Sequence, residues 1–379
     1  MDKDFEVLRK LSNSLGEKEV EEIIEALRRP PERYYLRVNT IKSSVKEVLS
    51  CLREEGIRAK RDEKLSEAIW MKVEGPNEIE ISGEEKEVVA DKFAAESVYQ
   101  GSNLYAPGVI KSKRVNPGDE VIIKAPNGVI VGKGVARMSS REMLVRKNGI
   151  AVETKQSVYL IPKIRETRAY LDGKIYPQSL PSMISSLALD PSPGERILDM
   201  CSSPGGKATH IAQITNNKSE IIALDVRNSR IRKLKENISR MGAKVRVIKM
   251  DARNSQILGK FDKVILDPPC SALGVRPKLF ETKNEKEIEV LSRYQYSLAR
   301  VIPKVLKRGG EAVYCTCTLT LEENEKIVEK LTELGLEVIE HEPFLGDKGI
   351  GEYHFSDRVQ RFYPNRLPVP GFFIAKLRC

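Results

Sequence analysis

The stretch that most constrains the fold is residues 195–210, Glu-Arg-Ile-Leu-Asp-Met-Cys-Ser-Ser-Pro-Gly-Gly-Lys-Ala-Thr-His. An apolar run ends at Asp199, small residues turn the chain, and a helix-like segment begins near Lys207. This is the order of a buried strand, a tight loop and a helix N-terminus. Gly205 and Gly206 let a ligand approach the backbone and the free N–H groups of the helix start. The pattern is neither a P-loop nor a dinucleotide fingerprint. It indicates a nucleotide-type cofactor loop, with an ordinary strand-to-helix turn as the alternative.

Strand-like and helix-like segments alternate from about residue 175 onward, which predicts a doubly wound α/β sheet. The expected strands are 196–199, 220–225, 245–250, 263–267, 310–315 and 372–377, and the expected helices are 209–214, 230–241, 286–306 and 322–334. Ligands bind such sheets at the carboxyl ends of the strands, where the polar motifs of this chain fall. Asp225, about twenty residues after the glycine loop, suits ribose hydroxyls, or else caps the next helix. Asp251 ends the third strand and could approach an adenine amino group. Together with the loop they describe a site for an adenosine-bearing cofactor.

The first part of the chain predicts a small α/β domain, residues 1–91, that packs on the catalytic domain. Apolar residues at helical spacing indicate one helix over 5–28, ended by Pro30 and Pro31, and another over 45–54. Alternating residues predict strands at 34–38 and 57–59. Nothing catalytic is expected in this domain.

Residues 92–168 form a second predicted domain, of short strands divided by Gly and Asn, as in a small β-barrel. One of the expected strands is 143–146. The segment holds 14 Lys or Arg and 6 Asp or Glu, a net charge of +8 in a chain whose total is +10. Such a concentration of positive charge favours a polyanion partner, although a basic surface without a partner is also open. The runs 101–109, 118–121 and 128–134 resemble a PUA domain, a compact RNA-binding barrel.

Two cysteines fall at strand ends that should meet in one cleft: Cys270, in Asp267-Pro-Pro-Cys-Ser271, and Cys317, in Cys315-Thr-Cys-Thr318. Methylation of cytosine at C5 needs a nucleophile, because a thiolate that adds to C6 makes C5 enamine-like. Asp267 could then hydrogen-bond the N3/N4 edge of the base. The alternative is that the cysteines are buried free thiols that pack as small hydrophobes. That alternative is the expectation for Cys51, Cys315 and Cys379.

The second half of the chain, residues 175–379, resembles the Sun-domain family of RNA 5-methylcytosine methyltransferases. The resemblance rests on 199–209, Asp225-Val-Arg, Asp251-Ala-Arg, Asp267-Pro-Pro-Cys-Ser271, 315–325 and 371–377, together with Arg37-Val-Asn-Thr40. It implies S-adenosylmethionine as cofactor and a Rossmann-like methyltransferase sheet, residues 169–379, with an inserted antiparallel strand. It also implies that Cys317 is the nucleophile and that Cys270 assists product release. Two serines replace the alanines common in the family's loop, a change between small residues.

The same resemblance implies a set of cofactor-binding residues: Cys201, Ser202, Ser203, Pro204, Gly205, Gly206, Lys207, Asp225, Arg230, Asp251 and Asp267. Lys207 and Asp267 are also expected to face the cytosine, which makes them catalytic candidates beside the two thiols.

A PUA domain between the first and the catalytic domain resembles one subgroup, which methylates a cytosine near the 3′ end of the tRNA acceptor stem, position 72. We expect tRNA as partner, contacted through Tyr105, Lys111, Lys113 and Arg114, and an archaeal source. The alternatives are a ribosomal RNA methyltransferase, a DNA cytosine methyltransferase, and an RNA-binding assembly factor without catalysis.

Several classes of protein are not expected. No apolar run approaches a membrane span and Met1 leads into a charged segment, so we expect no membrane partner and a cytoplasmic location. The six cysteines lack paired CxxC spacing, so no metal is expected. A monomer is the default expectation.

Overall fold

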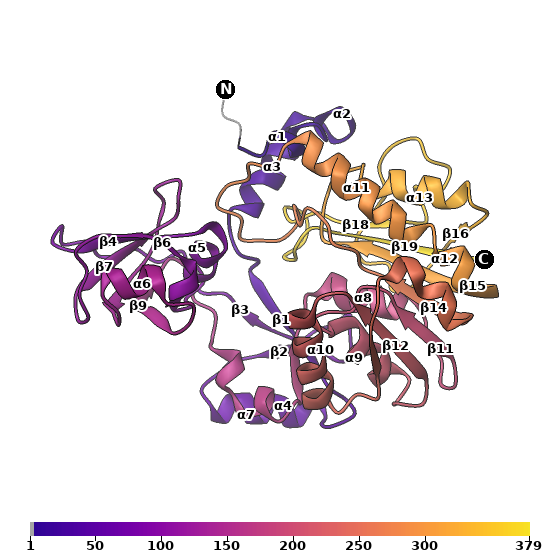
Figure 1. The fold of residues 1–379 in the computed structure, drawn as a ribbon, viewed down its shortest axis with the longest axis horizontal. Helices are drawn as coiled ribbons and strands as arrows, with labels where there is room; N and C mark the ends of the chain where they lie inside the picture. Colours follow the sequence, from indigo (N-terminus) through magenta and orange to yellow (C-terminus); the bar gives the residue numbers. More distant parts are fainter. Residues whose placement is uncertain (1–3) are drawn as a thin grey trace.

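The computed structural model describes residues 4–379, and its strands form three sheets. Figure 1 shows the basic β domain standing to one side of the catalytic sheet, with the N-terminal helices and sheet between the two. None of the helices within the described residues combines the length and the apolar character needed to cross a bilayer.

The catalytic sheet has nine strands in the order β13-β12-β11-β14-β15-β19-β18-β17, with β16 also pairing β19. Its strands are β11 (Arg196–Asp199), β12 (Glu220–Asp225), β13 (Arg246–Lys249), β14 (Phe261–Leu266), β15 (Leu306–Thr316), β16 (Glu337–Ile339), β17 (Asp347–Lys348), β18 (Gln360–Phe362) and β19 (Phe372–Arg378). Strands β11 to β15 are parallel, and β19 runs antiparallel to β15. The predicted Rossmann-like sheet with its inserted antiparallel strand is confirmed.

Helices cover both faces of this sheet, so its central strands are apolar on both sides. The helices are α8 (Leu180–Ala188), α9 (Gly206–Ile214), α10 (Asn228–Met241), α11 (Glu285–Ala299), α12 (Ile302–Val305) and α13 (Glu325–Thr332), with the 3-10 helix η3 (Ala252–Leu258). Alternate residues of β11 enter different cores, Leu198 the one beneath α13 and Ile197 the one beneath α8. The single helix expected over 286–306 is divided in two, because Pro303 begins a new turn.

The N-terminal sheet has four strands in the order β10-β1-β3-β2. They are β1 (Arg33–Val38), β2 (Lys60–Arg61), β3 (Ala68–Lys72) and β10 (Ile175–Pro177), and the helices are α1 (Glu6–Arg9), α2 (Ser12–Leu15), α3 (Glu17–Leu27), α4 (Val45–Glu54) and α7 (Arg168–Leu171). Strand β10 belongs to this sheet although it lies after residue 169. The predicted catalytic domain, 169–379, therefore includes one strand of the N-terminal sheet. The expected helix over 5–28 is three short helices, with Gly16 at a positive φ of 86° before α3.

The basic domain is a six-stranded sheet in the order β5-β9-β8-β7-β4-β6. The strands are β4 (Lys86–Ala90), β5 (Leu104–Tyr105), β6 (Val109–Ser112), β7 (Glu120–Lys124), β8 (Ile130–Ala136) and β9 (Ile150–Ser157), with α5 (Lys92–Val98), α6 (Ser140–Val145) and the 3-10 helices η1 (Ala106–Gly108) and η2 (Ile164–Glu166). The predicted boundary at residues 91/92 cuts off β4, since its partners β6 and β7 come later in the chain.

One predicted element of this domain is wrong: 143–146 is not a strand but lies mostly in α6. A capping box explains the helix, because the Ser139 hydroxyl accepts from the backbone N–H of Glu142 while the Glu142 side chain accepts from Ser139. The two linkers of the domain meet each other at an isolated antiparallel bridge between Glu74 and Leu160.

Candidate active site

The loop after β11 turns within a few residues, and two glycines make that turn possible. Gly205 has a φ of +106°, and a Cβ there would lie 2.9 Å from the side chain of Leu234 on α10. A Cβ on Gly206, the first residue of α9, would lie 3.3 Å from the ring of Tyr176. Asn237 on α10 holds the loop by donating to the Pro204 carbonyl at 2.9 Å. The loop is therefore clamped between α10 and the N-terminal sheet.

A cavity of about 340 Å³ opens in front of this loop. Seven of the predicted cofactor-binding residues line it: Cys201, Ser202, Ser203, Pro204, Gly206, Lys207 and Asp267. Asp199 lines it as well, and residues from other segments close it, namely Arg165, Tyr170, Tyr176, Gln178, Lys233 and Asn237. The sequence analysis did not select this second group, because the fold brings its members together from η2, α7, the end of β10 and α10.

The polar atoms in this cavity are incompletely satisfied. Both carboxylate oxygens of Asp199 and the Ser202 hydroxyl are buried without a hydrogen-bond partner among residues 4–379. Burial raises the pKa of Asp199 to about 7. Buried polar groups without partners are rare, so these atoms suit a ligand that carries donors and a positive charge. The ammonium and hydroxyl groups of S-adenosylmethionine meet that requirement.

Three further predicted cofactor-binding residues lie near the loop but outside the cavity wall. Asp225 ends β12, is buried, accepts from the backbone N–H of Arg227 and pairs with Arg230 at 3.2 Å. The N-cap of α10 is Arg227, and no side chain among residues 4–379 caps this helix, so the alternative role of Asp225 as a helix cap is wrong. Asp251 is bound to Arg253 at 2.6 Å and caps η3.

The two thiols at the strand ends meet, as the sequence predicted. Cys270 follows β14 and Cys317 follows β15, two neighbouring parallel strands, and their Sγ atoms are 3.3 Å apart. Neither cysteine is disulfide-bonded and both are half-buried. By contrast, Cys315 is fully buried in the core, as expected. Cys379 is exposed, so the expectation of a buried thiol is wrong there, since it follows the last residue of β19.

Glu323 connects the loops that carry the two thiols. Its fully buried carboxylate accepts from the backbone N–H of Ser271 at 2.8 Å and from the hydroxyl of Thr318 at 3.3 Å. Ser271 follows Cys270 and Thr318 follows Cys317, so one side chain fixes both loops. Gln295 and Thr320 donate to the same carboxylate at 2.8 and 2.9 Å. The sequence analysis gave Glu323 no role, although it stands in the 315–325 motif.

A lysine–carboxylate pair lies on the floor of the site. Lys207 Nζ is 2.5 Å from Asp267 Oδ2 and lies over the ring of Phe372. Burial by itself would lower the pKa of Lys207, but the carboxylates of Asp267 and Asp199 outweigh it and raise that pKa above its ordinary value. Lys207 is therefore a fixed cation between the cofactor cavity and the thiols.

The N-terminal domain supports the cofactor loop through Arg37 of β1. Its guanidinium is fully buried and donates to Gln178 at 2.9 Å, Gln213 at 2.7 Å and Thr209 at 2.8 Å. Two of these partners lie on α9, whose N-terminus faces the cavity. A domain in which nothing catalytic was expected thus orients the cofactor loop.

The predicted RNA-contacting residues are all on the surface of the basic domain. Tyr105 is 54% exposed and lines a groove that also contains Arg165, which itself lines the cofactor cavity. Lys111, Lys113 and Arg114 are exposed on β6 and the loop after it, outside that groove. None of these three cations pairs with a carboxylate of the described chain.

Three family models match this chain. The 16S rRNA methyltransferase RsmB/F model matches residues 186–378, the PUA domain model matches 86–158, and the ferredoxin-like domain of RsmF/B-like methyltransferases matches 7–78. Within the described residues, no group of three or more His, Cys, Asp or Glu side chains could hold a metal ion.

Two tRNA methyltransferases are among the known proteins that are similar over nearly the whole chain. A tRNA (cytosine(72)-C(5))-methyltransferase of Pyrococcus horikoshii is 46% identical, covering 97% of this chain and 94% of that protein. The mouse protein tRNA (cytosine(72)-C(5))-methyltransferase NSUN6 is 31% identical, covering 94% and 84%.

Among solved structures, NSun6 from Pyrococcus horikoshii with SFG, an analogue of S-adenosylmethionine, superposes with a TM-score of 0.90 at 45% identity, covering 99% of this chain and 97% of that one. The fold, the PUA domain and the cofactor predicted from the sequence are thereby confirmed. The chain belongs to the RsmB/F (Sun) family of S-adenosylmethionine-dependent methyltransferases, in a form that carries a PUA domain.

Proposed function

We propose that this enzyme methylates C5 of a cytosine in tRNA, at position 72 of the acceptor stem. The observation that carries the proposal is the pair of thiols, 3.3 Å apart, beside the Lys207–Asp267 pair. The two relatives described above, at 46% and 31% identity over nearly the whole chain, bear that activity in their names. Two thiols at this spacing suit a base whose C5 must be activated before it can take up a methyl group.

In the proposed reaction Cys317 Sγ bonds to C6. The electron pair of the C5–C6 double bond shifts toward C4 and N3, which makes C5 enamine-like and nucleophilic. S-adenosylmethionine would supply the methyl group that C5 takes up and would leave as S-adenosylhomocysteine. Water from the solvent takes up the C5 proton, the C5–C6 double bond forms again, and the bond between C6 and Cys317 Sγ breaks. Asp267 hydrogen-bonds the N3/N4 edge of the base, and Lys207 holds that carboxylate in place.

The environment of the thiols supports this division of roles. The hydrogen bond with Cys317 and burial raise the pKa of Cys270 well above the ordinary value. Cys270 therefore tends to keep its proton, which suits a thiol that assists a neighbouring nucleophile. A protonated Cys270 can donate to the leaving Cys317 sulfur, which fits the role of assisting product release.

The cofactor would be held by the loop from Cys201 to Gly206, with Asp199 opposite its positive charge. Asp225, Arg230 and Asp251 stand around the cavity and are proposed as outer contacts. Arg230 donates to the Ser203 carbonyl at 3.3 Å and so acts through the loop.

The PUA domain would supply contacts to RNA phosphates, which position the substrate, while the cleft takes a single base out of its stack. Most of its other cations pair with carboxylates, for example Lys133 with Glu85 and Arg137 with Glu153. The unpaired Lys111, Lys113 and Arg114 therefore remain for a polyanion.

Ribosomal RNA is the second candidate substrate, because several relatives bear that activity in their names. Their similarity supports it less. An rRNA (cytosine-C(5))-methyltransferase of Arabidopsis thaliana covers 93% of this chain at only 26% identity, and the mouse 28S rRNA (cytosine-C(5))-methyltransferase is 36% identical over only 57% of this chain. A non-catalytic assembly factor is disfavoured by the paired thiols.

The test is methyl transfer from labelled S-adenosylmethionine to unmodified tRNA and to ribosomal RNA, with bisulfite mapping of the product. The proposal expects one methylated acceptor-stem cytosine, no product from Cys317→Ser, and an RNA–protein adduct that accumulates with Cys270→Ser. Methylation of ribosomal RNA alone would overturn the substrate. Activity that depends on Cys270 and survives in Cys317→Ser would reverse the roles of the thiols.

A further inference from the structure

The loop between β14 and α11, residues 272–284, connects the thiols to the PUA domain. It begins directly after Ser271, and the backbone N–H of Gly274 donates to the Cys317 carbonyl at 2.9 Å. A Cβ at Gly274 would lie 2.3 Å from the Gly371 carbonyl oxygen, so this end of the loop is packed tightly against the catalytic domain. The other end is the N-cap of α11, Asn284.

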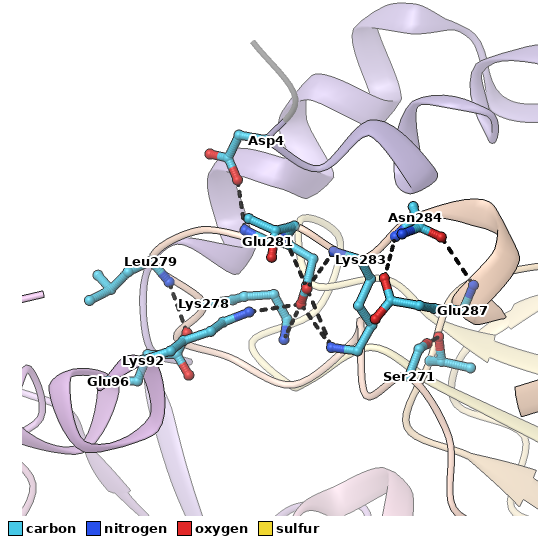
Figure 2. Close-up of polar contacts among 12 residues, drawn as sticks. Asp4, Lys92, Glu96, Ser271, Lys278, Leu279, Glu281, Lys283, Asn284 and Glu287 are labelled. Carbon is cyan, nitrogen blue, oxygen red and sulfur yellow. Dashed lines mark hydrogen bonds and ion pairs between the residues drawn. The ribbon is translucent and has the colours of Figure 1, made fainter. Parts of the chain in front are cut away.

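Further along, the loop enters the PUA domain. Leu279 is buried in the same core as the strands of that domain. Its backbone N–H donates to Glu96 of α5 at 3.1 Å, as Figure 2 shows. Lys92, also on α5, lies over the ring of Phe280. The loop is thus a part of the catalytic domain that completes the core of the RNA-binding domain.

Glu281 is the polar centre of this junction. Its side chain is 2% exposed and receives Lys92 of the PUA domain at 2.9 Å, Lys278 at 3.2 Å and Lys283 at 3.3 Å (Figure 2). Burial would raise the pKa of Glu281, but the hydrogen bond from Lys92 and the charges of the lysines outweigh it and hold the pKa at about 2. Glu281 is therefore a permanent anion, and Lys92 is its partner from the other domain.

The N-terminal helices close the junction from the third side. The Glu281 backbone N–H donates to Asp4 at 2.7 Å, and the Glu281 carbonyl accepts from the N–H of Phe5 at 3.0 Å. The backbone N–H of Lys278 donates to the Leu27 carbonyl at 2.7 Å. Three domains therefore meet on one short loop, which begins two residues after Cys270 and hydrogen-bonds the backbone of Cys317.

We infer that Glu281, through its ion pair with Lys92, is a positioning residue that fixes the PUA domain relative to the two thiols and so determines which nucleotide of the bound RNA reaches Cys317. The inference rests on the proposed function for its substrate. Its basis is that a displacement of about 1 Å at a reacting centre lowers rates by about 100-fold, and the loop gives a rigid path between the RNA-binding surface and the cleft.

The decisive variant is Lys92→Gln, because Lys92 lies outside the catalytic machinery and supplies the cross-domain half of the pair. We expect kcat on tRNA to fall about 10- to 100-fold, while KM for tRNA and the affinity for S-adenosylmethionine change less than about twofold. Bisulfite mapping should also show methylation spread to neighbouring cytosines. Lys92→Arg should restore the rate and the single site.

Lys283→Gln is the matched control, since Lys283 pairs with the same carboxylate from within the loop; we expect kcat and the methylated site to be unchanged. If Lys92 had a purely structural role, Lys92→Gln would lower the unfolding temperature but keep the kcat of the wild type. For this comparison kcat is measured well below the unfolding temperature and is expressed per cofactor-binding site. An unchanged kcat and site in Lys92→Gln would overturn the inference.

Failure of the proposed function would be visible separately, because the wild type would then methylate no tRNA. In that case amide hydrogen exchange of residues 272–284 decides. Faster exchange in Lys92→Gln but not in Lys283→Gln supports the fixed junction, and equal exchange in all three proteins refutes it.

Discussion

Two buried glutamates hold loops in this enzyme, one at the thiols and one at the domain junction, and their partners differ in kind. Glu323 is bound by hydroxyl, amide and backbone N–H groups, which carry no charge. Glu281 is bound by ammonium groups from two domains. Charge-assisted hydrogen bonds are about twice as strong as neutral ones and suit a junction between domains. Neutral donors fix the thiol loops without adding a further cation to the one that Lys207 already supplies at the site.

The most direct test of this difference is to remove the carboxylate of Glu323 and that of Glu281 in separate variants. Glu323→Ala leaves several buried donors unpaired, and we expect about 3–5 kcal/mol less free energy of unfolding and a kcat at least about 100-fold lower. Glu281→Ala frees Lys92 and Lys283, whose side chains are partly exposed and can be rehydrated, while the buried Lys278 keeps the nearby charge of Glu96. We therefore expect about 1–3 kcal/mol less free energy of unfolding. Urea denaturation measures both. Equal losses would contradict the distinction drawn between the two acids.

Asp199 extends the comparison to a buried acid whose carboxylate has no hydrogen-bond partner among residues 4–379. Its folded-state pKa of about 7 lies above its unfolded value, so the folded protein holds an extra proton and loses stability as pH rises between about 4 and 7. A bound cation favours the ionised form, so affinity for S-adenosylmethionine should rise as pH increases through about 7. Asp199→Asn should lower that affinity about 10- to 100-fold and abolish the pH dependence.

Calorimetric titration of the wild type and of Asp199→Asn with S-adenosylmethionine at several pH values measures this affinity and its pH dependence. An Asp199→Asn protein that keeps the rise near pH 7 would assign the titration to another group. Thermal unfolding supplies the control, because the Asn variant should gain stability relative to the wild type as pH rises.

Arg37 tests whether the N-terminal domain acts on the site at all. Its guanidinium serves four acceptors in a plane, which the single ammonium of Arg37→Lys cannot reproduce. We expect the affinity for S-adenosylmethionine to fall about tenfold. Arg33→Lys, in the same strand but stacked on Trp70, is the matched control and should leave it unchanged. Equal affinities for the two variants would show that β1 only stabilises the fold.

The smallest effect is expected from the unpaired cations of the PUA domain. Lys111→Ala with Lys113→Ala should weaken tRNA binding about 3- to 10-fold and reduce the slope of log affinity against log salt by about 1–2, with kcat unchanged. This is the reverse of the pattern for Lys92→Gln, since unpaired lysines supply affinity and the paired one supplies position. A fall in kcat without weaker binding would remove that distinction.

The sequence predicted the parts of the site that depend on strand ends. Neighbouring parallel strands end at one edge, so Cys270 and Cys317 had to lie close once β14 and β15 were recognised. Glu323 could not be placed in this way, because its contacts depend on how the loop after β15 folds back.

Contacts between domains were the least predictable. Strand β10 pairs with β1, which lies far away in the sequence, and Arg37 reaches α9 across a domain boundary. Nothing local in the sequence encodes such pairings. The region 143–146 was mispredicted for a local reason instead. The capping box at Ser139 and Glu142 starts a helix there, although the apolar pattern is typical of a strand.

The bridge between Glu74 and Leu160 has a consequence for how such enzymes can be built. The chain leaves the N-terminal sheet after β3 and re-enters it at β10 with its two linkers already side by side. A polypeptide joined directly across that bridge could close the same four-stranded sheet without the PUA domain. The PUA domain is therefore an inserted domain whose two ends lie side by side, and another RNA-binding domain could be inserted at the same position of the N-terminal sheet. The loop that carries Glu281 would then have to be redesigned, because its Leu279 completes the core of the present PUA domain.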